Sequence, residues 1–301
     1  MFDRLTLSED LVDCRGDTLA PRGSVISPEA IRDAALSARP VARHRVSDSA
    51  LASDLTLALE ASTYQHLFGR SGAGQAVERL VLAAELPGPL LDELTAMRTA
   101  APALYRHGVL PAAVAVRMLL ASVGETRALP DVASAALVHD LGMRHLPPTV
   151  LTHCDRLPVE LAHRIAAHPL LGAYHLAVVL GNHPAVAAAQ GHHWRCGQGY
   201  PVLSAAPSRS AEVIAVASAF AALTQPRPYR SSAYDARGAA DVLVGEAMSG
   251  HADGNSVKLL VHALRGGDGD PRAVRFGGSR EGHAPAQNHH APVDAPVRGG
   301  L

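Results

Sequence analysis

Apolar residues recur at helical spacing along the longest part of the chain, from about residue 50 to 265. Leu90 and Leu94, for example, lie four residues apart on one helical face. Residues 210–224 are almost wholly apolar, which is typical of a helix buried on all sides. The pattern predicts a mainly α fold built as a bundle of packed helices.

The two ends of the chain depart from this pattern. Residues 1–45 contain short apolar pieces separated by Gly and Pro, and Ser27 followed by Pro28 has the chemistry of a helix start. We expect a small α+β module there, then a helical connector over 46–100 and a main helical domain over 101–265. Residues 266–301 are rich in Gly, Pro and polar residues, so we expect a disordered C-terminal tail.

Composition and charge argue against several kinds of ligand and binding site. The net charge is −1, and no basic stripe is visible, which argues against a nucleic-acid polymer as ligand. No uncharged apolar run has the length of a membrane span, and acidic residues occupy the place of a signal peptide's apolar stretch, so we expect a cytoplasmic protein. The three cysteines form no CxxC pair, which argues against a cysteine-rich zinc site.

Histidine is over-represented, with 17 residues against four Phe, six Tyr and one Trp. Several lie on or at the end of predicted helices, so a bundle can bring them together: His107, His139 beside Asp140, His168, and the pair His192 and His193. Imidazole and carboxylate suit Fe, Mn or Zn, and bound metal can activate water for hydrolysis. The spacing alone equally allows hydrogen-bonded core histidines.

Four segments carry a resemblance to a known family. They are ALVHDLGMRHLPPTVL at 136–151, IAAHPLLGAYHL at 165–176, GHHWRCGQGYP at 191–201 and EVIAVASAFAALTQPRPYR at 212–230. In this order they resemble the HD-GYP family of metal-dependent phosphohydrolases, over about residues 100–265. The small N-terminal module also looks like one often found ahead of HD-GYP domains.

The resemblance implies an all-helical HD bundle that hydrolyses cyclic di-GMP with bound divalent metal. By position it implies that Asp140 is a catalytic residue, that Tyr200 and Arg227 face the nucleotide, and that the metal ligands are His107, His139, Asp140, His168, His192 and His193. An ungapped count back from Gly-Tyr-Pro places the family's ligand pair on Gly191 and His192 instead. A one-residue deletion in the turn restores His192 and His193.

The sequence departs from the family at charged positions. The family's lysine after the HD pair is Met143, its metal-binding Asp is Ser218, a later Asp is Ala221, and a Glu one turn before His107 is Ala103. Fewer carboxylates neutralise less metal charge. We therefore expect a weakened site that holds one or two ions.

Three functions remain open at this stage. The first is a phosphohydrolase acting on cyclic di-GMP or a related nucleotide phosphodiester. The second is a catalytically degenerate protein that binds a nucleotide or a signalling protein partner, and the third is a helical scaffold. The N-terminal module is a candidate for partner docking or for forming a homodimer.

Overall fold

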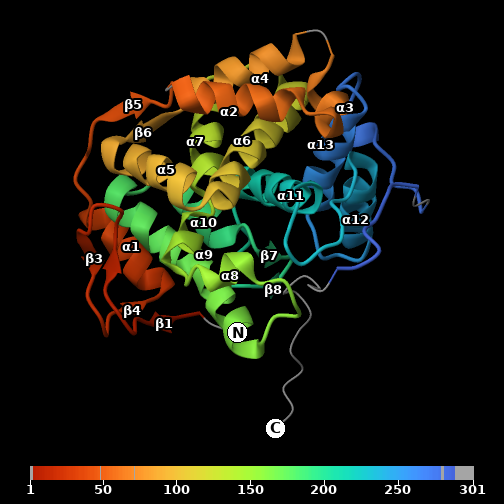
Figure 1. Cartoon of the computed structure of the whole chain (residues 1–301). Helices are drawn as coiled ribbons and strands as arrows, with labels where there is room; N and C mark the ends of the chain where they lie inside the picture. The colour runs from red at the N-terminus through yellow and green to blue at the C-terminus, as the bar shows by residue number, and fades with distance from the viewer. Residues whose placement is uncertain (1–2, 48, 71, 279–280, 289–301) are drawn as a thin grey trace.

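The computed structural model describes residues 3–47, 49–70, 72–278 and 281–288. The fold is mainly α, as predicted (Figure 1). Its helices are α1 Pro28–Ser37, α2 Ser49–Glu60, α3 Gln65–Phe68, α4 Ala73–Leu82, α5 Gly88–Ala100, α6 Pro102–Val123, α7 Leu129–Val138, α8 Thr149–Thr152, α9 Val159–Leu180, α10 Pro184–Gly191, α11 Arg209–Thr224, α12 Ala236–Met248 and α13 Gly254–Leu264. Short 3-10 turns are η1 Ser62–Tyr64, η2 Leu141–His145 and η3 Pro271–Ala273.

The strands are short and pair only two at a time within the described residues. They are β1 Leu5–Thr6, β2 Leu11–Val12, β3 Thr18–Ala20, β4 Val25–Ile26, β5 Arg43–Arg45, β6 Glu85–Pro87, β7 Trp194–Arg195 and β8 Gln198–Gly199. All four pairs are antiparallel: β1 with β4, β2 with β3, β5 with β6, and β7 with β8. Because β5 pairs with β6, the end of the N-terminal module is hydrogen-bonded to the helical connector.

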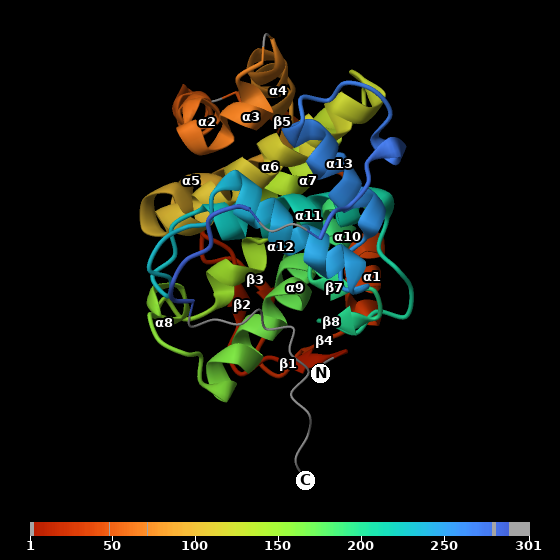
Figure 2. The same cartoon turned by 90° about the vertical axis from the view of Figure 1, so that its right-hand side faces the viewer.

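The N-terminal strands and α2–α4 lie at opposite ends of the molecule (Figures 1 and 2). Helix α1 begins as predicted, because the Ser27 side chain caps it by accepting from the Ala30 N–H and Pro28 fills the first helical position. It packs along α9. The module therefore contacts the main bundle through one of the helices that carries a predicted metal ligand.

Helices α6, α7, α9, α10 and α11 form the centre of the bundle. Helix α6 is long and apolar enough to span a membrane by length and composition, but it is a central helix and most of it is packed inside the protein. Two glycines allow close helix contacts. A Cβ at Gly108 would clash with the backbone of α7 at Leu137, and one at Gly142 would clash with the backbone of α9 at His168. These contacts bring His107 and Asp140 close to neighbouring helices.

A buried polar group, here called the Glu93 cluster, joins the N-terminal module to the bundle. Its members are Cys14, Glu93, Arg144, His145 and His175. The fully buried Glu93 carboxylate accepts from the Cys14 backbone N–H at 2.7 Å and lies 2.6 Å from Arg144 Nε. His145 Nε2 and His175 Nδ1 are 3.1 Å apart. The cluster thus connects the turn after β2, α5, η2 and α9.

The first part of the expected C-terminal tail packs on the bundle. Val274 is buried, and Asp241 on α12 accepts hydrogen bonds from the backbone N–H groups of Glu281 and Gly282. Residues 281–288, here called the C-terminal strap, continue along the Arg230–Ser232 segment, and Arg230 pairs with Asn288. Hydrogen bonds compensate for the low apolar content of the strap. Residues 289–301, the rest of the expected disordered tail, lie outside the described residues.

Candidate metal centre

Four helices bring the predicted metal ligands together, and all of these residues except His139 line one cavity. His107 lies within α6, His139 and Asp140 follow α7, His168 lies within α9, and His192 and His193 follow α10. Apart from His193, the histidine side chains are almost completely buried. The predicted histidines are therefore brought together, as the bundle hypothesis required. That they bind metal stays a prediction.

Three of these histidines are oriented by their own helices. The Nδ1 atom lies 2.7 Å from the Ala136 carbonyl in His139, 2.6 Å from Ile165 in His168, and 2.8 Å from Ala189 in His192. A carbonyl oxygen can only accept, so each Nδ1 carries the proton and each Nε2 presents a lone pair to the site. This is the tautomer that a metal ligand requires.

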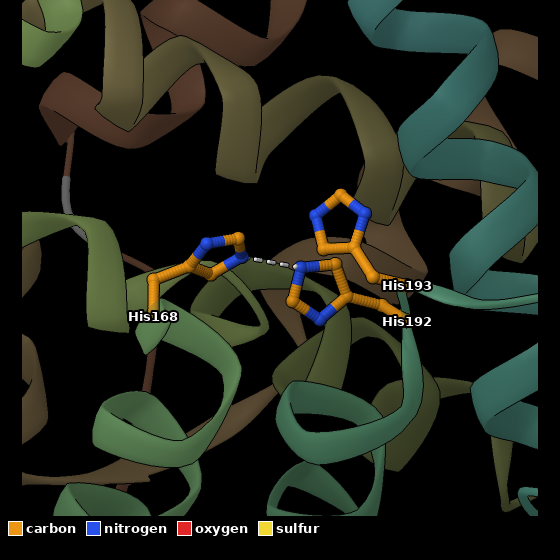
Figure 3. Close-up of side chains that lie close together, drawn as sticks. All are labelled: His168, His192 and His193. Atoms are coloured by element: carbon orange, nitrogen blue, oxygen red, sulfur yellow. Dashed lines mark hydrogen bonds between the residues drawn. The ribbon is translucent and has the colours of Figure 1, made fainter. Parts of the chain in front are cut away.

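The Nε2 atoms converge on one another. Figure 3 shows the rings of His168 and His192 pointing a nitrogen toward each other across a short gap, with His193 beside them. The Nε2 atoms of His168 and His192 are 3.0 Å apart. Two lone pairs at that distance repel unless a cation or a proton lies between them. Ligand atoms of His168, His192 and His193 lie within 4.8 Å of one another, as do those of a second group, His107, His139 and Asp140.

Asp140 lies between the two groups. Its Oδ1 is 3.2 Å from His168 Nε2 and 3.8 Å from His192 Nε2, and its Oδ2 is 3.9 Å from His107 Nε2. Buried Oδ1 accepts no hydrogen bond from the part of the chain that the structure describes. Burial raises the pKa of Asp140 to about 7, and nearby Arg227 opposes the rise. An orphaned carboxylate oxygen amid imidazole lone pairs fits a divalent cation.

Burial also keeps the histidines neutral. It lowers the pKa of His139 to about 4 and that of His168 to about 3. In both residues the backbone hydrogen bond opposes the effect of burial. Near neutral pH these rings are therefore in the uncharged form that coordinates Fe, Mn or Zn.

The structure separates the family departures noted in the sequence. Ser218 Oγ is 3.0 Å from His139 Nε2 and 3.3 Å from His107 Nε2, so the missing Asp would have completed the second ligand group. Ala103 and Met143 line the cavity. Ala221, by contrast, is fully buried on α11 and is not part of the cavity wall, so its side chain does not affect the site directly.

The cavity above the histidines has a volume of about 390 Å³ and contains both predicted substrate residues. The β7–β8 hairpin turns at Cys196 and Gly197, both with positive φ, and carries Tyr200 back over His193. The two rings stack 4.6 Å apart at an interplanar angle of 18°. Arg227 enters from the loop after α11, and its buried Nε has no hydrogen-bond partner among the described residues.

Other residues of the site were not predicted from the sequence. Gln225 contacts His107, and Arg195, Arg230, Glu246 and Asn288 line the cavity. Arg195 Nη1 is paired with Glu246 at 2.7 Å. Gln225 stands two positions before Arg227, a proximity that was visible in the sequence. Asn288 lies in the expected tail and gave no signal.

Comparison with known proteins supports the geometry. The model of the HD domain family matches residues 89–256, more than half of the chain. The chain belongs to the HD domain family. This HD domain is also similar to 3'3'-cGAMP-specific phosphodiesterase 1 of Vibrio cholerae serotype O1, with 38% identity over 99 residues. That match covers 32% of this chain and 23% of the relative, so the chain spans about a quarter of the protein it matches.

Proposed function

We propose that this HD domain is an HD-GYP-type, metal-dependent phosphodiesterase that hydrolyses a cyclic dinucleotide, cyclic di-GMP or a related molecule such as 3'3'-cGAMP. The observation that carries the proposal is the orphaned Asp140 carboxylate between two groups of converging imidazole nitrogens. HD-family membership and the partial likeness to a cyclic dinucleotide phosphodiesterase support it. Such a messenger is met in the cytoplasm, where we propose that the protein acts.

The residues divide into metal-binding and substrate-binding parts. His168, His192 and His193 would hold one ion, His107 and His139 a second, and Asp140 would contact both. Bound divalent metal would lower the pKa of water and stabilise negative charge on the phosphate. Because Ser218 adds no charge to the second group, we propose that the second ion binds more weakly than the first.

Protein side chains would position the substrate. The Arg227 guanidinium offers a planar fork of donors that matches a phosphate group. Tyr200, held against His193, forms part of the same wall. In hydrolysis, water adds to phosphorus as the ester P–O bond breaks. The proton that the water loses passes to the oxygen of the leaving ester group. Asp140 would act in catalysis as the carboxylate that lies between the two ligand groups.

The test combines metal analysis and turnover. Protein purified without chelator is analysed for bound metal and incubated with cyclic di-GMP or 3'3'-cGAMP and Mn²⁺ or Fe²⁺, and linear products are identified by mass spectrometry. We expect turnover by the wild type and a further increase in Ser218→Asp, which restores the missing carboxylate. The proposal would be contradicted by metal-loaded protein that binds neither of the two nucleotides and forms no product from them.

A second function is favoured by the substitutions at Met143 and Ser218. Both remove charge from the cavity while Tyr200 and Arg227 remain. A protein with this pattern could bind the nucleotide without cleaving it and signal to a protein partner or through a homodimer. In the same experiment, saturable nucleotide binding without product would identify this function.

A further inference from the structure

His107 differs from the other buried histidines in what holds its ring. His139, His168 and His192 each donate to a carbonyl three residues earlier on their own helix. His107 Nδ1 instead lies 3.0 Å from Oε1 of Gln225, which is 118 residues later in the chain. The orientation of this one metal-ligand candidate therefore depends on a side chain from the loop after α11.

The Gln225 amide has a defined orientation. Its Nε2 donates to the backbone carbonyl of Arg106 at 3.1 Å, so its oxygen is the atom that faces His107. The flipped amide would place its oxygen against the Arg106 carbonyl oxygen, which would bring two acceptors together with no proton between them. Gln225 thus acts as an acceptor, which places the His107 proton on Nδ1 and leaves Nε2 free to coordinate.

Arg227 also contacts His107 Nδ1, but it favours the unprotonated form of this nitrogen. Its Nη2 lies 3.1 Å from His107 Nδ1, and a guanidinium can only donate. If Arg227 were the sole partner, Nδ1 would have to accept and the His107 proton would move to Nε2. A protonated Nε2 cannot bind metal. Gln225 and Arg227 therefore favour opposite tautomers of His107.

We propose that Gln225 is a positioning residue that holds His107 in its metal-binding tautomer against the competing donor Arg227. The inference rests on the proposed metal-dependent function and deepens it. It also links the two halves of the site. When Arg227 turns to a substrate phosphate, its competition for Nδ1 ends, so phosphate binding strengthens metal binding at the group that lacks an Asp at 218.

The test uses metal affinity and the tautomer itself, both independent of turnover. Gln225→Leu should weaken Mn²⁺ binding at the His107 group by about 10- to 100-fold, the usual cost of losing a partner that orients a metal ligand. Gln225→Glu keeps an acceptor at the same place and should restore binding. Arg227→Met, added to Gln225→Leu, should recover part of the lost affinity because the competing donor is gone.

Arg227→Met alone measures how the loss of the arginine charge changes metal affinity. The double-mutant cycle compares this value with the change that Arg227→Met causes in the Gln225→Leu background, and so isolates the competition for His107. In metal-free protein, long-range 1H–15N spectra should show His107 protonated at Nδ1 in the wild type and at Nε2 in Gln225→Leu. An unchanged tautomer in Gln225→Leu, or equal metal affinity with no rescue in the cycle, would overturn the inference. A wild-type protein that hydrolyses no cyclic dinucleotide, while Gln225→Leu still shows the tautomer change, would count only against the proposed function.

Discussion

The protein contains two buried clusters of histidine and carboxylate that differ in how the carboxylate charge is paired. In the Glu93 cluster the carboxylate lies 2.6 Å from the Arg144 guanidinium and accepts a backbone N–H. In the metal centre Asp140 Oδ1 has no hydrogen bond from the described residues, and the nearest atom that could pair with it, His168 Nε2, carries a lone pair. An Arg side chain pairs directly with the carboxylate of the Glu93 cluster, whereas among the described residues no Arg or Lys side chain forms an ion pair with Asp140.

This difference distinguishes a structural contact between two parts of the fold from a candidate metal site. Burial raises the pKa of Glu93, but Arg144 is the leading opposing influence, so the carboxylate is paired where it stands. The Glu93 cluster connects the N-terminal module to η2, only a few residues after Asp140. Glu93 Oε2 and His175 Nε2 also have no hydrogen-bond partner among the described residues, so the ion pair with Arg144 is what separates this cluster from the candidate metal site.

The largest expected effect is on metal binding. Asp140→Asn removes the charge shared by both ligand groups, so we expect metal affinity to fall more than 100-fold on the scale of ~1.4 kcal/mol per factor of ten. The free energy of unfolding of the metal-free protein should not fall, because the lost carboxylate was unpaired. Metal analysis and urea unfolding in chelator measure the two effects. If Asp140→Asn retained its metal, Asp140 would not be a metal ligand.

The reciprocal change breaks the Glu93 cluster. Arg144→Met leaves the buried Glu93 carboxylate without its cation, which should lower the free energy of unfolding by about 3 kcal/mol. Metal content of the folded protein should stay unchanged. Urea unfolding and metal analysis again provide the readouts, with Asp140→Asn as the matched control. A stable variant that loses metal would show that the two clusters are not independent.

The comparison also predicts that metal affinity depends on pH. Asp140 has its pKa raised to about 7, so metal must displace a proton from it below that pH. Metal affinity should therefore weaken by about tenfold per pH unit below 7 and level off above it, because one proton is exchanged. Titrations of Mn²⁺ between pH 6 and 8.5 measure this slope. A slope that persists above pH 8 would contradict it.

The smallest effect concerns the open side of the metal centre, where the C-terminal strap places Asn288 in the cavity wall. A chain ending at Arg280 should bind a cyclic dinucleotide about threefold to tenfold more weakly, the value of one or two hydrogen bonds. A chain ending at Asn288 is the matched control. The truncation removes no residue of the Glu93 cluster, so urea unfolding should differ little between the two chains. Equal nucleotide affinity would exclude the strap from the site.

Much of the candidate metal centre could be predicted from local sequence. The residues of the HD and His-His motifs end or occupy helices, and the carbonyl three residues earlier is within reach of Nδ1 by helix geometry alone. This local rule orients His139, His168 and His192. Helix α1 likewise follows from Ser27 and Pro28. The mainly α fold was predictable for the same reason, since helical periodicity is a property of neighbouring residues.

Contacts between distant residues were decided only by the tertiary structure. The pairing of Glu93 with Arg144, of His107 with Gln225, and of Arg230 with Asn288 joins residues that no local pattern relates. Whether a buried carboxylate is paired or orphaned depends on which helix packs beside it. The sequence therefore determined which side chains could bind metal, and the packing decided which carboxylate lacks a cation, because charge pairing in the core depends on distance in space.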